Sequence, residues 1–316
     1  MRRAFFVLCV AGLVLIAQRV STQSLMYSSG QDASPAFEGW EENADGTLSL
    51  VFGYMNRNWR EELDVPIGPD NSIGPGGPDQ GQPTHFLPRR NRFVFRVRVP
   101  KDFGTKELVW TLTTHGQTNK AYATLRTDYR LENIDLMSET GALGAGTSNP
   151  EVRSNQPPVV KVDGDKTRTV RVGEPLTLSA IVTDDGIPKR RNFGGGRTGS
   201  NTNTNNQNRG VNNPIPALNP PSRSTVGKTV GLHAGWFVYR GAGKVAFTPD
   251  QIEVWEDTRT GGNSPWSPLW TAPGLPADGK WTAQATFAEP GTYVIRVLAD
   301  DGGLFAADDV TVRVTP

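Results

Sequence analysis

The segment 291–303, GTYVIRVLADDGG, constrains the fold of this chain more than any other stretch. Its side chains alternate in polarity, which is the period of a β-strand that buries one face. The apolar face begins at Tyr293 and ends at Ala299, and the opposite face carries Arg296. A Pro-Gly pair opens the strand and an Asp-Asp-Gly-Gly run closes it, and both are turn formers. The chain therefore contains at least one sheet with a defined core face.

Short alternating segments recur along the whole chain. Its 316 residues include 35 glycines and 24 prolines, and these cluster between the apolar segments. Many short strands joined by turns are typical of all-β domains, so we predict an all-β chain with two β-sandwich domains. The segments are 47–54, 92–99, 108–112, 122–125, 170–172, 176–182, 234–238, 245–247, 252–255, 281–287, 293–299 and 310–314. In the second of them, we expect Phe93, Phe95, Val97 and Val99 to share the buried face.

The N-terminus is predicted to be a signal peptide over residues 1–23. Arg2 and Arg3 precede an apolar run, Ala4–Ala17, which is shorter than the ~20 residues that span a bilayer. An uncleaved anchor is the alternative. The only cysteine, Cys9, lies in this run, so the mature chain has no thiol for disulfides, metal binding or catalysis. We expect a bacterial protein that is periplasmic, secreted or on the cell surface, with no membrane span after signal removal.

Composition divides the rest of the chain. The first β-sandwich domain is predicted over residues 35–137, and we detect no helical period in it. A segment rich in Gly, Ser, Asn and Pro is predicted to be a linker over 138–156. The second domain is predicted over 157–316. A tract at about 188–228 has almost no apolar side chains, so we expect a disordered insertion there.

Two stretches of the second domain, VGEPLTLSAIVTDDG and EPGTYVIRVLADDGG, closely resemble PKD-type members of the immunoglobulin-like superfamily. The resemblance covers about residues 157–314 and implies a sandwich of about seven strands. Tyr293 stands where such folds form a tyrosine corner, and Trp236 lies on the third strand, where they bury a tryptophan. The insertion is longer than usual for this fold. Because the fold hosts many roles, the resemblance implies no particular activity.

Three stretches of the first domain resemble a group of exported bacterial proteins of unknown function. They are GWEENADGTLSLVFGYMNRN, EELDVPIGPDN and GPDQGQPTHFLPRR. This resemblance implies a class of protein and no chemistry.

Two acidic pairs, Asp184-Asp185 and Asp300-Asp301, are the candidate metal ligands. Each pair follows a predicted strand, and in a sequential antiparallel sandwich these two strands run in the same direction, so the pairs meet at one end. Crowded carboxylates favour a cation, and Ca²⁺ accepts several oxygen ligands. The alternative, which we favour, is that each Asp-Asp-Gly only forms a turn with its own backbone. We therefore expect no cofactor, with calcium as the candidate metal.

A basic stripe occupies the polar face of the predicted strand 92–99. Arg92, Arg96 and Arg98 are its candidate ligand-binding members, and anionic polysaccharide, lipopolysaccharide or phosphate groups are the candidate ligands. The alternative, which we favour, is a solvated face whose charge discourages edge-to-edge aggregation. We do not expect nucleic acid as a partner, because the net charge is only +1 and that face lacks interleaved aromatic residues for stacking.

The Pro-rich stretch SPWSPLWTAPGLP carries the last candidate site, Trp266 and Trp270. Indole rings on the loop of a sandwich can stack on sugar rings, which predicts glycan binding. The alternative is that the loop folds back and its tryptophans seal the core, because large aromatic rings bury much apolar surface.

The sequence lacks a convincing catalytic motif. The three histidines are isolated, without metal-ligand spacing, and no G-x-S-x-G stretch is present. The carboxylates Glu61, Glu62 and Asp64 alone do not indicate acid–base chemistry. We predict a non-catalytic adhesion, scaffold or interaction protein of the bacterial cell envelope, with a protein or cell-surface glycan as its partner. The alternatives are a carbohydrate-binding protein and, third, a hydrolase in the first domain.

Overall fold

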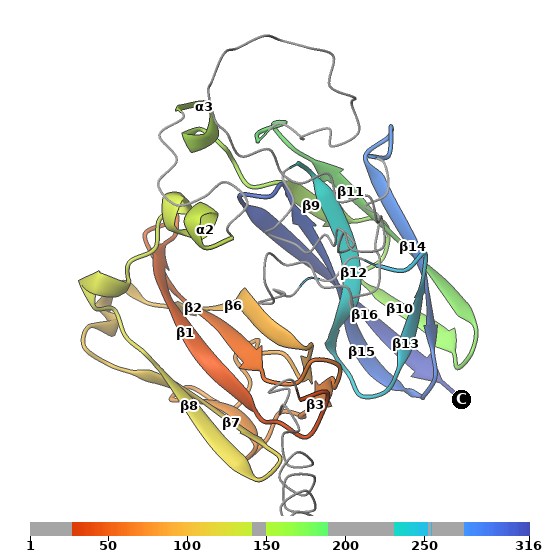
Figure 1. Cartoon of the computed structure of the whole chain (residues 1–316), viewed down its shortest axis with the longest axis horizontal. Coiled ribbons are helices and arrows are strands. Elements are labelled where there is room, and N and C mark those ends of the chain that lie inside the picture. Colours follow the sequence, from red (N-terminus) through yellow and green to blue (C-terminus); the bar gives the residue numbers. More distant parts are fainter. Residues whose placement is uncertain (1–26, 141–149, 189–230, 252–253, 255–274) are drawn as a thin grey trace, which may run out of the picture.

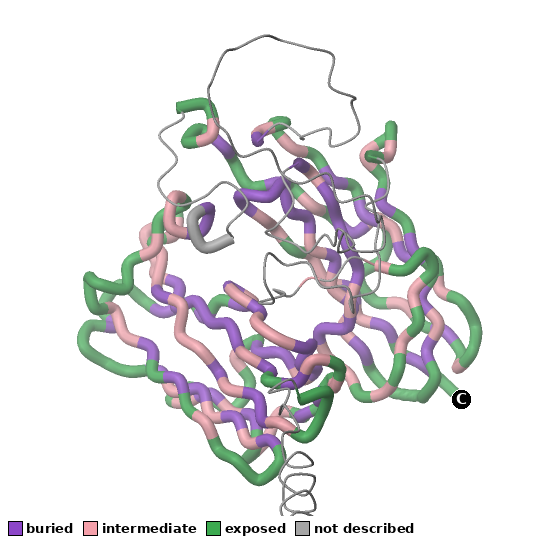
Figure 2. The backbone as a smooth tube through the Cα atoms, in the orientation of Figure 1, coloured by how far each residue is buried: buried purple, intermediate pink, exposed green. Residues whose placement is uncertain are grey.

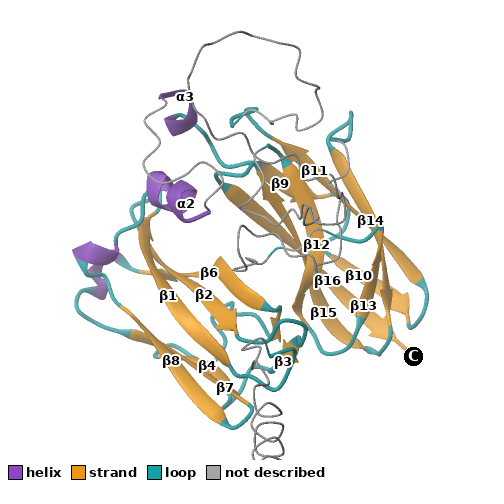
Figure 3. Cartoon of the chain, viewed as in Figure 1, coloured by secondary structure: helices purple, strands orange, loops and turns teal. Residues whose placement is uncertain are grey.

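The computed structural model shows an all-β molecule, as predicted, with two β-sandwich domains (Figures 1 and 3). It describes residues 27–140, 150–188, 231–251, 254 and 275–316. The predicted signal peptide, nearly all of the predicted insertion, and both Trp266 and Trp270 lie outside these residues. Within the described ranges, no helix combines the length and apolar character that a membrane span needs.

The N-terminal domain packs two three-stranded sheets face to face. The first sheet has the order β1 (Ala33–Glu42), β2 (Leu48–Asn56) and β6 (Arg89–Val99). The second has the order β4 (Asn71–Gly74), β7 (Leu108–Thr114) and β8 (Gln117–Ala123). A two-stranded sheet of β3 (Leu63–Asp64) and β5 (His85–Phe86) lies beside them. Strand β1 is one that sequence periodicity did not predict.

The core of the N-terminal domain is aromatic. Trp110 is fully buried on β7 and lies 5.0 Å from the ring centroid of Phe95 and 6.0 Å from that of Phe52. Its indole Nε1 donates to Asn71 Oδ1 at 3.0 Å, which satisfies its one polar atom in the core. Strand β2 is buried on both faces, and its second face turns away from this core.

The prediction for strand β6 was wrong at Phe93. Its ladder with β2 is interrupted between Phe52 and Tyr54, and Phe93 has a left-handed backbone with φ of 53°. A bulge of this kind changes the face on which the following side chain lies. Phe93 therefore leaves the aromatic core and packs with Val51 on the outer face of the sheet.

The predicted linker contains helix, which the sequence analysis did not anticipate. Helix α2 (Asn133–Thr140) begins at the end of the first domain, and α3 (Pro150–Arg153) precedes the second. Two short 3-10 turns, η1 (Lys101–Phe103) and η2 (Thr127–Tyr129), lie earlier in the first domain. Leu136 and Met137 of α2 pack with Val51, Phe93 and Leu304 in a cluster outside both domain cores. Figure 2 shows that residues between the two domains are buried.

The second domain has the strand order of an immunoglobulin-like sandwich. One sheet has the order β13 (Val245–Thr248), β14 (Lys280–Phe287), β11 (Pro175–Thr183) and β9 (Val159–Val162). The other has the order β10 (Thr167–Arg171), β16 (Phe305–Thr315), β15 (Gly291–Asp300) and β12 (His233–Arg240). Strand β10 pairs with β16 in parallel, and the other pairs are antiparallel.

The two residues that fit an immunoglobulin-like fold are buried as expected. Tyr293 has no exposed surface, and Trp236 is 2% exposed. The Tyr293 hydroxyl donates to the carbonyl oxygen of Glu289 at 3.0 Å, which is the contact of a tyrosine corner. Gly241, with φ of 125°, lies against the Tyr293 ring, and a Cβ there would collide with the ring.

Candidate functional site

The two domains are joined by a dense set of polar contacts. The segment 79–84 of the N-terminal domain lies along β12, where Thr84 N donates to Tyr239 O at 3.3 Å. Arg240 forms two hydrogen bonds with the Asp79 carboxylate, at 2.7 and 3.0 Å. The hydroxyl of Tyr239 donates to Gly81 O at 2.5 Å. The sequence analysis did not predict these contacts of segment 79–84, because contacts between distant segments leave no local periodicity.

Arg296 is the polar centre of this interface. Its guanidinium forms two hydrogen bonds with Asp309, at 2.7 and 2.9 Å, and donates to Val94 O of the N-terminal domain at 2.8 Å. It also lies 3.5 Å above the Tyr239 ring. Burial by itself lowers the pKa of Arg296, but the hydrogen bond and charge of Asp309 and the contact with Tyr239 raise it above its ordinary value. The sequence pattern had placed Arg296 only on a polar strand face.

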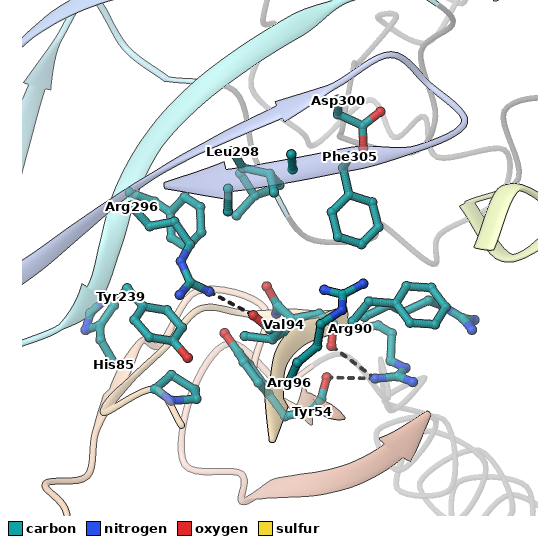
Figure 4. Close-up of a pocket in the computed structure, with 18 residues that line it drawn as sticks. Tyr54, His85, Arg90, Val94, Arg96, Tyr239, Arg296, Leu298, Asp300 and Phe305 are labelled. Atoms are coloured by element: carbon teal, nitrogen blue, oxygen red, sulfur yellow. Dashed lines mark hydrogen bonds between the residues drawn. The ribbon is translucent and has the colours of Figure 1, made fainter. Parts of the chain in front are cut away.

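A cavity of about 120 Å³ lies at the domain interface. Figure 4 shows that Tyr54 and Val94 approach it from the N-terminal domain, and Tyr239 and Leu298 from the C-terminal domain. Phe305 of the β15–β16 hairpin lines it as well, with its ring 6.1 Å from that of Phe93. Small-molecule sites occur preferentially in such concave places between domains, so this cavity is the candidate functional site.

Four arginines contribute to the cavity wall, namely Arg90, Arg92, Arg96 and Arg296. Arg90 binds both carboxylate oxygens of Glu38, at 2.6 and 2.7 Å. Burial raises the pKa of Glu38, and the charge and hydrogen bond of Arg90 oppose that rise. Gly53 permits this pair, because a Cβ there would collide with the Glu38 carboxylate.

The structure separates the three arginines of the predicted basic stripe. Arg92 and Arg96 line the cavity, whereas Arg98 is directed to solvent and pairs with Asp45 at 3.2 Å. Arg96 holds Glu41 through Nε, at 2.5 Å, and Nη2, at 3.4 Å. A role for these arginines in binding an anionic ligand stays a prediction.

His85 also lines the cavity and lies between two carboxylates. Its Nδ1 is 2.7 Å from Asp64 Oδ1 and its Nε2 is 3.0 Å from Glu62 Oε2. Burial lowers the pKa of His85, but the hydrogen bonds and charges of the two carboxylates outweigh burial and raise it to about 9. His85 is therefore an imidazolium at neutral pH. Glu61, the remaining carboxylate of this group, accepts a hydrogen bond from Gly30 N.

The two acidic pairs meet at one end of the second domain, as the strand directions predicted. Asn155 Nδ2 donates to Asp301 Oδ2 at 3.1 Å, and the next residue, Gln156, donates its amide to Asp185 Oδ2 at 3.1 Å. Burial raises the pKa of Asp301 to about 6, with a further contribution from the charge of Asp184. Burial raises the pKa of Asp184 too.

All four aspartates form turns with nearby backbone amides. Asp300 and Asp184 each accept from the amide two residues on, at 2.6 and 2.9 Å, and Asp185 accepts from Ile187 N at 2.8 Å. Asp301 accepts from two consecutive amides, at 2.6 and 2.8 Å. Among the residues that the structure describes, no group of three His, Asp or Glu side chains has an arrangement that could hold a metal ion. A calcium site stays a prediction.

Replacing Asp301 by Asn tests whether this end is a turn or a calcium site. The buried oxygen Oδ1 of Asn155 has no hydrogen-bond partner among the described residues, so Asn155 can reorient to accept from the new amide. Because folding raises the pKa of Asp301 to about 6, the contribution of this carboxyl group to stability rises as the pH falls from 6 to about 4. We expect Asp301→Asn to abolish that gain and to stabilise the chain at pH 7 by about 1–3 kcal/mol.

Thermal unfolding between pH 4 and pH 8 measures this effect. The same melts with calcium chloride and with EDTA test the metal. A midpoint that calcium raises in the wild-type chain, and not in Asp301→Asn, would establish calcium binding. A melting midpoint that calcium does not change would indicate that these aspartates only form turns with their own backbone.

Comparisons with protein-family models and with curated proteins find no match. Among solved structures, the chain is similar to domains 4 and 5 of the S-layer protein SbsC, with 10% identity over 90% of this chain and 98% of that chain, and a TM-score of 0.21. It is similar to titin domains Z1Z2 in complex with telethonin, with 12% identity over 90% and 98% and a TM-score of 0.23. The I67–I69 fragment of titin has 9% identity over 90% and 64%, and a TM-score of 0.21. At TM-scores this low, the immunoglobulin-like assignment rests on strand order.

Proposed function

We propose that this protein is a non-catalytic structural or interaction component of a bacterial cell envelope. In this proposal a PKD-type domain and an N-terminal sandwich, similar to exported bacterial proteins, act as one rigid body. Loops at the ends of the sandwiches would bind the partner, a protein or a surface glycan. Glycan binding through Trp266 and Trp270 stays the alternative.

One observation supports the proposal: polar and apolar contacts hold the two domains in a fixed relative position. Arg296 and Arg240 each hold a carboxylate and reach the backbone of the other domain. Apolar residues of α2 also pack with Leu304 of the second domain. Domains within a chain commonly move relative to each other unless their interface is extensive. A fixed spacing between two loop-bearing ends suits a scaffold or an adhesion protein.

Cysteine labelling in intact cells tests the envelope location. Tyr122 is 55% exposed on β8, and Cys9 is the only native cysteine, so Tyr122→Cys in a Cys9→Ser background carries a single accessible thiol. We expect a membrane-impermeant maleimide to label it in intact cells, or after the outer membrane alone is permeabilised.

The Cys9→Ser chain without the new thiol is the control for background labelling. Labelling that appears only after complete lysis would place the protein in the cytoplasm and would overturn the proposal.

A further inference from the structure

The cavity between the domains is close in volume to one that holds a single benzene ring. Its volume is about 120 Å³, which approaches the roughly 150 Å³ of an apolar protein cavity known to hold benzene. Aromatic and aliphatic side chains make much of the wall, with Tyr54, Phe93, Leu298 and Phe305 among them. A wall of this kind favours an apolar guest over water.

Arg96 differs from Arg296 and Arg90, two other arginines at this site. Arg296 uses all of its guanidinium nitrogens on Asp309 and Val94 O. Arg90 uses both Nη atoms, on Glu38 and on backbone carbonyls. Arg96 uses only Nε and Nη2, both on Glu41, so Nη1 has no hydrogen bond within the part of the chain that the structure describes.

The position of Arg96 places this free donor at the mouth of the cavity. Its side chain is 37% exposed, and it borders two further surface hollows, one beside Asp79 and one beside Glu132. The bond to Glu41 holds the planar guanidinium in one orientation, so a ligand oxygen would meet a donor that is already oriented. The cavity thus offers a largely apolar wall and, in Nη1 of Arg96, an oriented charged donor.

We propose that the interdomain cavity binds a small organic acid, with its ring or short apolar chain between the domains and its anionic group on Nη1 of Arg96. A hydrogen bond from a charged donor to an anion is stronger than one to a neutral acceptor. The site is therefore selective for the anion over a neutral molecule of the same shape. This site is separate from the loops through which the proposed envelope role would act.

Phenylacetate and its neutral analogue phenylacetamide are the probes, and ligand-observed NMR titration of the full mature chain is the measurement. We expect phenylacetate to bind about tenfold more tightly than phenylacetamide. Arg96→Gln should remove this difference while leaving phenylacetamide binding unchanged. Ala307→Phe, which adds a ring at an exposed position on the cavity wall, should abolish binding of both probes.

Arg98→Gln is the matched control, because Arg98 lies on the same strand, outside the cavity, and pairs with Asp45. It should bind both probes as the wild-type chain does. The proposal is overturned if neither probe binds, if the two probes bind equally well, or if Arg98→Gln and Arg96→Gln have the same effect. A thermal melt of each variant shows that the fold is retained.

Discussion

Replacing Arg296 by Ala is expected to make the two domains unfold separately. The wild-type guanidinium joins Asp309 of its own domain to Val94 O of the other and covers the Tyr239 ring. Breaking a buried ion pair commonly costs 3–5 kcal/mol. Because Asp309 is 39% exposed, it can rehydrate, and we expect a loss near the lower end, about 3 kcal/mol. One cooperative transition should become two.

Differential scanning calorimetry measures the number of unfolding transitions. Double electron–electron resonance measures the distance between two spin labels, one on each domain. Spin labels at Tyr122→Cys and Ile181→Cys, both exposed and on different domains, should give a narrow distance distribution in the wild-type background. Arg296→Ala should broaden it. Arg313→Ala is the control, because Arg313 is exposed on the neighbouring strand β16.

Arg296→Met provides a second variant that keeps an apolar stem over Tyr239. It should lose less stability than Arg296→Ala, since part of the packing is retained. A single unchanged transition in both variants, with a narrow distance distribution, would contradict the central role of Arg296 in the interface.

Replacing His85 by Gln is expected to remove a pH dependence of stability at neutral to alkaline pH. The folded pKa of about 9 exceeds the unfolded value of about 6.5, so the folded chain binds this proton more tightly. The stabilisation is complete below pH 6.5 and is lost as the pH rises through 9. His85 is only 5% exposed, but both carboxylates are partly solvated, so we expect about 2–3 kcal/mol.

Chemical denaturation at intervals from pH 6 to pH 10 measures this loss. His85→Gln should be less stable than the wild-type chain at pH 6 and similar to it at pH 10. His115→Gln is the control, because His115 is 38% exposed and lies 3.3 Å from Glu61. A wild-type stability that stays flat between pH 6.5 and 9 would show that His85 is not held as an imidazolium.

Local alternation was enough to predict the all-β class and the burial of Tyr293, and the resemblance to PKD-type domains implied the burial of Trp236. In each strand apolar and polar side chains alternate every second residue, so one short segment is enough to predict the strand and its buried face. The strand directions also brought Asp184 and Asp301 to the same end of the second domain, where the structure places them.

Contacts between the domains could not be predicted in this way. Phe93 fits the alternation of its strand, but the backbone bulge sends it to the other face, and its partner Phe305 is more than two hundred residues away. The sequence pattern places Arg296 on a polar strand face and so indicates a surface position. Its contact with Val94 O could not be predicted, because Val94 lies far away along the chain. The short helix α2 lies in a polar segment, and among its described side chains Leu136 and Met137 are the buried ones, with Ile134 partly buried.

The burial of both faces of β2 has a consequence for the order of synthesis. The N-terminal domain leaves the ribosome first, at a stage when α2 covers its outer apolar residues Val51 and Phe93 only in part, because Leu304 and Phe305 of the second domain have not yet been made. The nascent N-terminal domain therefore exposes an apolar, aggregation-prone surface until the second domain emerges and docks on it. The later half of the chain thus protects the earlier half from aggregation, and gene fragments ending near residue 156 are poor units for expression.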